Sequence, residues 1–179
     1  QVLSEISDSR HIFINDAGSS NYISSQALNL DNSQREITSG AFYTMGLTLP
    51  LAVGAATIEP KSQIIAITGD GSIELNIQEL QTIGLNNLNI KIVVINNGGY
   101  ASIRDSQDAM CGGRYTDDEQ ILNFMKIANA FNIDFEIIQD FSEIKAVMNK
   151  VFLNDRPTII EVVCDDSQYM IQPLKEEIN

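Results

Sequence analysis

The sequence of 179 residues has no tryptophan, one histidine, two cysteines, and 11 basic residues against 24 acidic ones. The formal net charge of -13 leaves no basic patch for a phosphate backbone or an anionic membrane surface, so we expect neither nucleic acid nor membrane as a partner. Cys111 and Cys164 are far apart and lack metal-ligand spacing, which indicates free thiols in a reducing, cytoplasmic compartment. No apolar run reaches transmembrane length, and no signal peptide is visible.

The sequence does contain enough apolar side chain, 44% of its residues, to bury a sizeable core, and its length suits one domain. Apolar strand candidates alternate with helix candidates, and no internal repeat or second-domain boundary is visible. We therefore predict a single α/β domain over residues 1–179, with a doubly wound, mainly parallel sheet and helices on both faces. The chain begins with Gln1 rather than Met, which favours a piece of a longer protein.

Two strand candidates near the middle of the chain end in polar residues. The apolar run over 64–68 leads into Gly69-Asp70-Gly71-Ser72, and the run over 90–95 leads into Asn96-Asn97. Between them, residues at helical spacing predict one helix over 73–84, with its inner face formed by Ile73, Ile77, Leu80 and Gly84. This is a strand–helix–strand unit, whose parallel strands bring their polar tips to one edge of a sheet.

The residue types at these tips suit a metal ion and a phosphate group. The glycines on either side of Asp70 allow a tight turn, and the amides of Gly71 and Ser72 would open a helix toward an anion. Asp70 and Asn97 offer oxygen ligands of the kind that Mg²⁺ prefers. An ordinary strand-to-turn junction is the alternative interpretation of Gly69-Asp70-Gly71 taken alone, but the combination with the double asparagine indicates a metal-bridged diphosphate.

Gly69-Asp70-Gly71, followed some two dozen residues later by Asn96-Asn97, resembles the thiamine diphosphate-binding motif. The chain is similar, over nearly its whole length, to the C-terminal, diphosphate-binding domain of acetolactate synthase-like enzymes. The resemblance implies that the side chains of Asp70 and Asn97 and the backbone carbonyl of Gly99 bind Mg²⁺. It implies cofactor contacts from a larger set: Gly18, Ser19, Ser20, Thr44, Met45, Gly69, Asp70, Gly71, Ser72, Asn97, Gly99 and Tyr100.

The segment over 37–50 also resembles this family. There the resemblance implies that Met45 wedges beneath a bent cofactor and that the backbone carbonyl of Tyr43 accepts a hydrogen bond from the aminopyrimidine, so both are catalytic candidates. From the pattern alone, Met45 is core filler, and Ser19 and Ser20 cap a helix that carries Ile23 on its inner face. Tyr43 stands where the family commonly has glycine.

Four other residues bear on function. Arg104 and Arg114 are candidates for binding a substrate carboxylate, the alternative being surface ion pairs. Ser106 stands where acetolactate synthases of branched-chain amino acid biosynthesis usually have tryptophan, which leaves the substrate pair open. His11, the only histidine, is expected at the surface or as a cap rather than in catalysis.

The resemblance implies an enzyme that decarboxylates a 2-oxo acid such as pyruvate and ligates the product to a second carbonyl compound. In that family the cofactor lies between domains of different subunits, and a pyrimidine-binding domain supplies a catalytic glutamate. A chain of 179 residues has no room for that domain. We therefore expect a homodimer completed by a pyrimidine-binding domain of the same or a partner chain, little turnover by this chain alone, and FAD only in a full-length parent.

Two alternatives stay open. One is the small subunit of a two-chain 2-oxo acid decarboxylase of the sulfopyruvate or phosphonopyruvate type. The other is a non-catalytic α/β binding module, against which the presence of both Asp70 and Asn97 counts.

Overall fold

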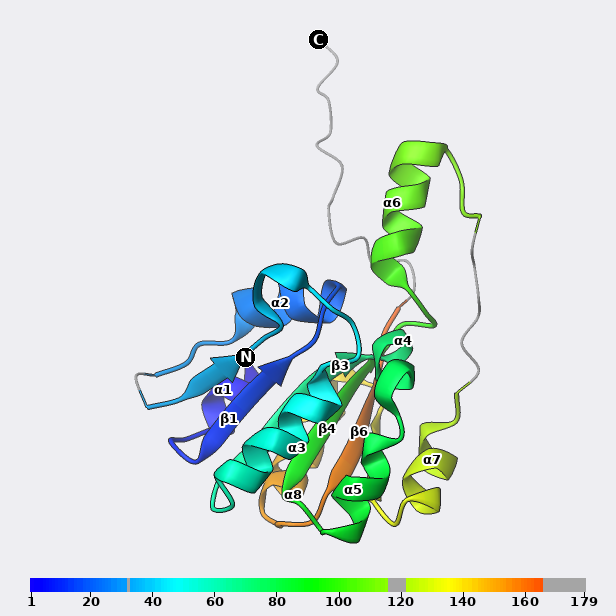
Figure 1. Cartoon of the computed structure of the whole chain (residues 1–179). Helices are drawn as coiled ribbons and strands as arrows, with labels where there is room; N and C mark the ends of the chain where they lie inside the picture. The colour runs from blue at the N-terminus through cyan, green and yellow to red at the C-terminus, as the bar shows by residue number, and fades with distance from the viewer. Residues whose placement is uncertain (32, 116–121, 166–179) are drawn as a thin grey trace.

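The computed structural model describes residues 1–31, 33–115 and 122–165, which form a six-stranded sheet with helices on both faces (Figure 1). The strand order is β2-β1-β3-β4-β6-β5, and every neighbouring pair is parallel. The predicted doubly wound α/β fold is confirmed. The strands are β1 (His11–Asn15), β2 (Arg35–Ile37), β3 (Gln63–Gly69), β4 (Ile90–Asn96), β5 (Asp134–Ile138) and β6 (Thr158–Val163).

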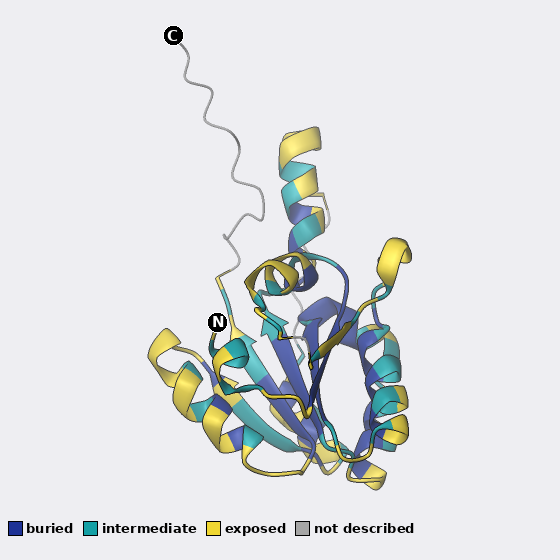
Figure 2. Cartoon of the chain, turned by 90° about the vertical axis from the view of Figure 1, so that its left-hand side faces the viewer, coloured by how far each residue is buried: buried dark blue, intermediate teal, exposed yellow. Residues whose placement is uncertain are grey.

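Two apolar clusters, one on each face of the sheet, form the core. Successive side chains of β3 point alternately into the two clusters: Ile64 and Ala66 belong to one, and Ile65 and Ile67 belong to the other. Helices α3, α5 and α7 cover the first face, and α1 and α8 cover the second. Figure 2 shows the central strands buried between these layers. The α-helices are α1 (Val2–Ile6), α2 (Ser19–Ala27), α3 (Thr48–Ile58), α4 (Asp70–Ile73), α5 (Glu79–Leu85), α6 (Ala101–Cys111), α7 (Phe124–Ala130) and α8 (Ile144–Phe152), and the 3-10 turns are η1 (Gly40–Phe42), η2 (Glu74–Asn76) and η3 (Phe141–Glu143).

The chain reverses direction across the sheet between β1 and β3. From β1 it moves outward to the edge strand β2, and it then returns past β1 to β3 on the other side. The loops that follow β1 and β3 therefore diverge, which opens a crevice at the carboxyl ends of these strands. Helix α6 follows β4 at the same edge and projects away from the sheet (Figures 1 and 2).

The prediction of one continuous helix over 73–84 is wrong. The segment is divided into α4, η2 and α5, although Ile73, Leu80 and Gly84 are buried as predicted. The tighter turn of η2 brings Asn76 against the loop before α3, where its side-chain amide donates to the carbonyl oxygen of Gly46 at 2.9 Å. The hydrophobic period identified the inner face, but it could not show this contact with a distant loop.

The start of α2 also differs from the prediction. The N-cap is Gly18, with φ of 78°, and Ser19 and Ser20 are the first two residues of the helix. The hydroxyl of Ser20 donates to the carbonyl oxygen of Ala17 at 3.3 Å rather than capping a backbone amide. Ile23 is 58% exposed, so the predicted inner face of this helix is wrong as well.

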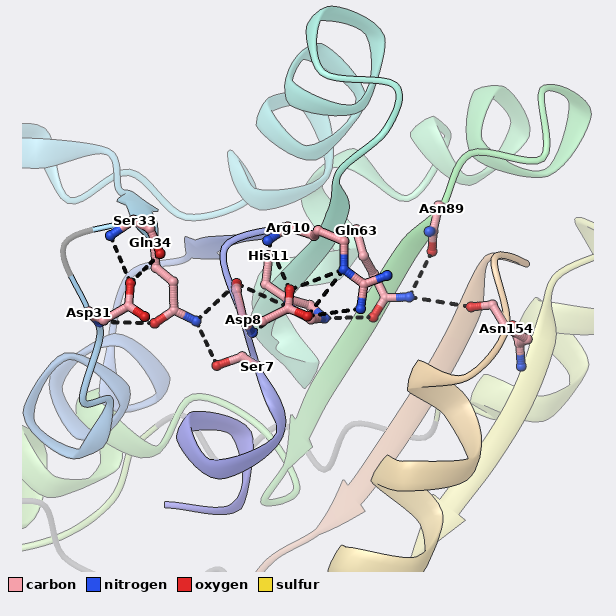
Figure 3. Close-up of polar contacts among 10 residues, drawn as sticks. All are labelled: Ser7, Asp8, Arg10, His11, Asp31, Ser33, Gln34, Gln63, Asn89 and Asn154. Atoms are coloured by element: carbon pink, nitrogen blue, oxygen red, sulfur yellow. Dashed lines mark hydrogen bonds and ion pairs between the residues drawn. The ribbon is translucent and has the colours of Figure 1, made fainter.

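His11 begins β1 at the amino edge of the sheet and is 4% exposed. Its Nδ1 accepts from the backbone amide of Asp8 at 2.8 Å, and its Nε2 lies 3.2 Å from Oε1 of Gln63. Gln63 in turn donates to Oδ1 of Asn89 and to the carbonyl oxygen of Asn154 (Figure 3). Of the two positions expected for His11, the surface position is wrong, because its ring is buried beside that of Phe152, with ring centroids 5.5 Å apart. The bond from the Asp8 amide fits the alternative, a capping role.

A second buried polar group at this edge is the ammonium of Lys91 in β4. The side chain is fully buried, and Nζ donates to Oδ1 of Asn154 at 3.2 Å and to the carbonyl oxygen of Arg156. Burial lowers the pKa of Lys91 to about 8, against a smaller opposing effect of Asp155 and Asp134. The folded state therefore disfavours the charged form of this side chain.

We expect the free energy of unfolding to rise with pH between about 8 and 10.5, because the unfolded chain then keeps a proton that folded Lys91 has lost. The rise should be about 1.5 kcal/mol from about pH 8 to about pH 9.5. Urea unfolding at these two pH values measures it. The variant Lys91→Met has no titrating group there and should lack the rise, whereas parallel pH profiles for the two proteins would contradict the burial argument.

Candidate functional site

A cavity of about 260 Å³ opens at the carboxyl edge of the sheet, at the crevice between the loops after β1 and β3. Four segments line it: 17–22, 43–45, 69–72 and 95–103. Thr44 is exposed and is not among the lining residues. The structure brings the other predicted site residues together around the cavity: Gly18, Ser19, Ser20, Tyr43, Met45, Gly69, Asp70, Gly71, Ser72, Asn97, Gly99 and Tyr100.

Asp70 directly follows β3 at the carboxyl edge of the sheet and is 2% exposed. Its Oδ1 accepts from the amide of Gly71 at 2.9 Å, and its Oδ2 accepts from the amide of Gly99 at 2.8 Å. Burial raises the pKa of Asp70, although hydrogen bonds from these amides act in the opposite direction. The Gly71 amide, expected to face an anion, is therefore engaged by the carboxylate. A cation beside this carboxylate would relieve the cost of burying its charge.

Asn97 lies in the turn after β4 and presents a buried oxygen without a partner. Its Oδ1 has no hydrogen-bond donor within the described part of the chain. The carbonyl oxygen of Gly99 accepts from the amide of Ala101 at 3.0 Å, which leaves its second lone pair available. Buried acceptors without partners are uncommon and call for a water or an ion. The donor set of Asp70, Asn97 and Gly99 thus fits a hard cation that takes oxygen ligands.

Met45 belongs to the loop before α3, and the next residue anchors that loop. The amide of Gly46 lies within hydrogen-bond distance of two acceptors, Oγ of Ser72 at 2.8 Å and Oδ1 of Asp16 at 3.2 Å. With φ of 81°, and with Leu75 2.7 Å from where the Cβ of a larger residue would lie, this position has room only for glycine. The loop is thereby held against α4 and η2, with Met45 in the cavity wall.

Asp16 is a site-organising residue that the sequence did not reveal. It is 1% exposed, and besides the Gly46 amide it accepts hydrogen bonds from the amide of Ala17 at 2.8 Å and the hydroxyl of Thr68 at 2.6 Å. The carboxylate therefore connects the ends of β1 and β3 to the Met45 loop. In the sequence, Asp16 is marked only by its position in a turn after a strand. Aspartates at the surface are common in such turns, so this position did not distinguish it.

Tyr43 adopts a left-handed conformation, with φ of 46° and ψ of 46°. Its ring stacks on that of Tyr22, with centroids 5.4 Å apart and planes inclined by 22°. Left-handed backbone is uncommon for a residue with a side chain. Tyr43 thus has a backbone conformation that favours glycine, and its ring lies in the cavity wall.

Neither arginine that was a candidate for a substrate carboxylate lines this cavity. Arg104 is 4% exposed, and its terminal nitrogens donate to the carbonyl oxygens of Gly98 at 2.9 Å and Asn97 at 2.7 Å. Nε of Arg114 pairs with Oδ2 of Asp108 at 3.0 Å. The structure therefore places Arg104 beneath the turn and Arg114 in an ion pair.

A second cavity, of about 500 Å³, lies around the start of β5 at the opposite edge of the sheet. Lys150 and Glu136 in its wall pair with each other at 2.6 Å, and Asp134 pairs with Arg156 at 3.0 Å. None of the predicted site residues lies there. Ligands of parallel α/β sheets bind at the carboxyl edge, which favours the smaller cavity as the functional site.

Two features are absent from the described ranges. No group of three or more His, Cys, Asp or Glu side chains there could hold a metal ion. A site at Asp70 would instead combine one carboxylate with amide and carbonyl oxygens. No helix in those ranges is both long enough and apolar enough to cross a membrane.

Similarity to known proteins extends over most of the chain. The family model described as "Thiamine pyrophosphate enzyme, C-terminal TPP binding domain" matches residues 16–162; TPP is another name for thiamine diphosphate. The acetolactate synthase isozyme 1 large subunit of Escherichia coli (strain K12) is 29% identical over 163 residues, which cover 88% of this chain and 28% of that protein. The acetolactate synthase large subunits of Cyanidium caldarium and Porphyra purpurea are 30% and 34% identical, over 94% and 83% of this chain and 29% and 26% of their own lengths. The chain spans less than a third of the length of these relatives.

Proposed function

Because the chain belongs to the thiamine pyrophosphate enzyme family, as the C-terminal TPP-binding domain of an acetolactate synthase-like member, we propose that it anchors TPP through Mg²⁺ at Asp70. The proposed protein ligands are the carboxylate of Asp70, Oδ1 of Asn97 and the carbonyl oxygen of Gly99. One observation carries the proposal: Asn97 Oδ1 is buried with no partner among the described residues, in the turn whose Gly99 amide donates to the buried carboxylate of Asp70.

The other lining residues have separate roles in this proposal. Gly18, Ser19 and Ser20 at the start of α2, with Gly69, Gly71 and Ser72, surround the diphosphate end of the cavity. Thr44 lies outside the cavity wall, so no lining contact supports the cofactor contact predicted for it. Tyr100 forms a side wall, since its ring lies 2.5 Å from the Cβ that a larger residue at position 71 would carry.

Met45 and Tyr43 are proposed to shape the reactive end of the cofactor. The Met45 side chain would support the cofactor from below, and the Tyr43 carbonyl would accept a hydrogen bond from its aminopyrimidine. The anchored loop around Gly46 supports this assignment, because the Gly46 amide next to Met45 donates to Ser72 and Asp16. When bound, TPP supplies the carbon nucleophile and the electron sink that decarboxylation of a 2-oxo acid requires.

The proposed reaction is decarboxylation of a pyruvate-like 2-oxo acid, with ligation of the product to a second carbonyl compound. Its support is that the relatives are acetolactate synthases. We propose that the chain acts as one domain of a cytoplasmic homodimer and that a pyrimidine-binding domain completes the site. The open mouth of the cavity supports a covering partner, since Phe42 beside it is 89% exposed and Ile103 is 49% exposed.

Calorimetric titration of TPP into this chain, with and without Mg²⁺, tests the proposal. We expect weak binding that requires Mg²⁺, and tighter binding after addition of a separately produced pyrimidine-binding domain from an acetolactate synthase large subunit. Absence of heat at millimolar TPP, with that domain and Mg²⁺ both present, would overturn the proposal and favour a non-catalytic module.

A further inference from the structure

Arg104 lies in the first turn of α6, yet its guanidinium does not face solvent or the cavity. The residue is 4% exposed, and a buried guanidinium is costly unless acceptors surround it. The acceptors here are main-chain carbonyl oxygens: Nη1 donates to Gly98 at 2.9 Å and Nη2 donates to Asn97 at 2.7 Å, while Nε has no partner among the described residues. A single planar group thus binds two consecutive peptide units of the turn after β4.

This turn has little stiffness of its own. Gly98 and Gly99 have φ of 75° and 130°, in a region where glycine meets no steric barrier. The amides of this turn donate to side chains other than Arg104: Gly98 donates to Oδ1 of Asn96 at 3.2 Å, and Gly99 donates to Oδ2 of Asp70 at 2.8 Å. Among the described side chains, Arg104 is the one that holds the carbonyl oxygens of residues 97 and 98.

We propose that Arg104 is a positioning residue for the metal site, an inference that rests on the proposed function. Its two fixed donors set the planes of the peptides after Asn97 and Gly98. Those planes fix the backbone that carries the Asn97 side chain and leads into Gly99, and so restrict the positions that Oδ1 of Asn97 and the carbonyl oxygen of Gly99 can take. Mg²⁺ requires near-octahedral geometry, so a turn with freely rotating peptides binds it less tightly. Groups that orient metal ligands commonly change metal affinity 10- to 100-fold when removed.

The test compares Arg104→Met, which removes both donors, with Arg104→Lys, which keeps the charge but not the two-donor plane. Arg156→Met is the matched control, because it removes an arginine that pairs with Asp134 at the opposite edge of the sheet. The readout is the MgCl₂ concentration that gives half-maximal TPP binding in calorimetric titrations, together with the thermal midpoint of each protein.

We expect this MgCl₂ midpoint to rise about 10- to 100-fold in both Arg104 variants. Saturating MgCl₂ should restore TPP binding, and Arg156→Met should keep the original midpoint. A wild-type midpoint in Arg104→Lys would overturn the inference, because charge alone would then suffice. A loss of TPP binding that MgCl₂ does not restore, with a lowered thermal midpoint, would also overturn it in favour of a general structural role. A wild-type chain that binds no TPP, with Mg²⁺ and the pyrimidine-binding domain both present, would instead overturn the proposed function, before any variant is compared.

Discussion

Replacement of Asp70 with alanine is expected to lower the affinity for TPP in the presence of Mg²⁺ by at least about 100-fold, more than the loss of a group that only orients a ligand. Asp70 contributes the one carboxylate among the described residues that line the cavity. Burial raises the pKa of this carboxyl, so its ionised form is costly until a cation neutralises it. Without Asp70, no carboxylate would remain among the described lining residues to bind the Mg²⁺ proposed to hold the diphosphate.

The measurement is the same calorimetric titration, with Asp134→Ala as the control. Asp134 also carries one negative charge, but it pairs with Arg156 at the other edge of the sheet. Because the Asp70 carboxylate also accepts from the amides of Gly71 and Gly99, Asp70→Asn serves as a second variant that keeps the shape of the side chain. Equal TPP affinity in wild type and Asp70→Asn, with Mg²⁺ required in both, would contradict a metal-binding role for Asp70.

Replacement of Gly84 with alanine is expected to destabilise the domain by about 3 kcal/mol, at the upper end for overpacking a core. Gly84 is buried in α5, and a Cβ there would lie 2.0 Å from the carbonyl oxygen of Phe131. That oxygen belongs to the backbone at the end of α7, so it cannot rotate away as a side chain would. The clash outweighs the gain of up to about 1 kcal/mol that alanine offers over glycine in a helix.

Gly54→Ala is a matched control for this prediction. Gly54 lies in α3, it is exposed, and a Cβ there would meet no atom within 4 Å. We expect this variant to be more stable than wild type by about 0.5 to 1 kcal/mol. Urea unfolding monitored by circular dichroism measures both changes. A Gly84→Ala variant as stable as wild type would show that α5 does not approach the end of α7 as closely as the structure has it.

The elements that carry the site could be predicted because their signals are local. Apolar runs before Gly69 and Asn96 indicated β3 and β4, and the polar residues after them marked the ends of the strands. Parallel strands place such ends at one edge, so Asp70 and Asn97 were expected to be neighbours from the spacing of the motif alone. The cavity between the loops after β1 and β3 agrees with that expectation.

The wrong predictions concern residues whose environment comes from distant parts of the chain. A surface position was one of the two expected for His11 because nothing nearby in the sequence encloses it, whereas in the fold its ring lies beside that of Phe152, with centroids 5.5 Å apart. Ile23 looked buried from its spacing in α2, but the helix turns that side chain to solvent. The segment over 73–84 was predicted as one continuous helix because its local sequence gives no sign that Asn76 contacts Gly46, which lies in a distant loop.

The sequence by itself determined the fold class, the positions of β3 and β4 and the candidate ligands for Mg²⁺ and diphosphate at their ends, because hydrophobic period and ligand chemistry are properties of short segments. It did not determine the short edge strand β2. The tertiary structure alone decided how those residues are held. Asp16 meets the amide of Gly46 30 residues away and the hydroxyl of Thr68 52 residues away. Arg104 turns back to the carbonyl oxygens of the Asn97 turn rather than outward to a substrate. Such contacts depend on which loops the sheet order brings together, and no segment encodes that order alone.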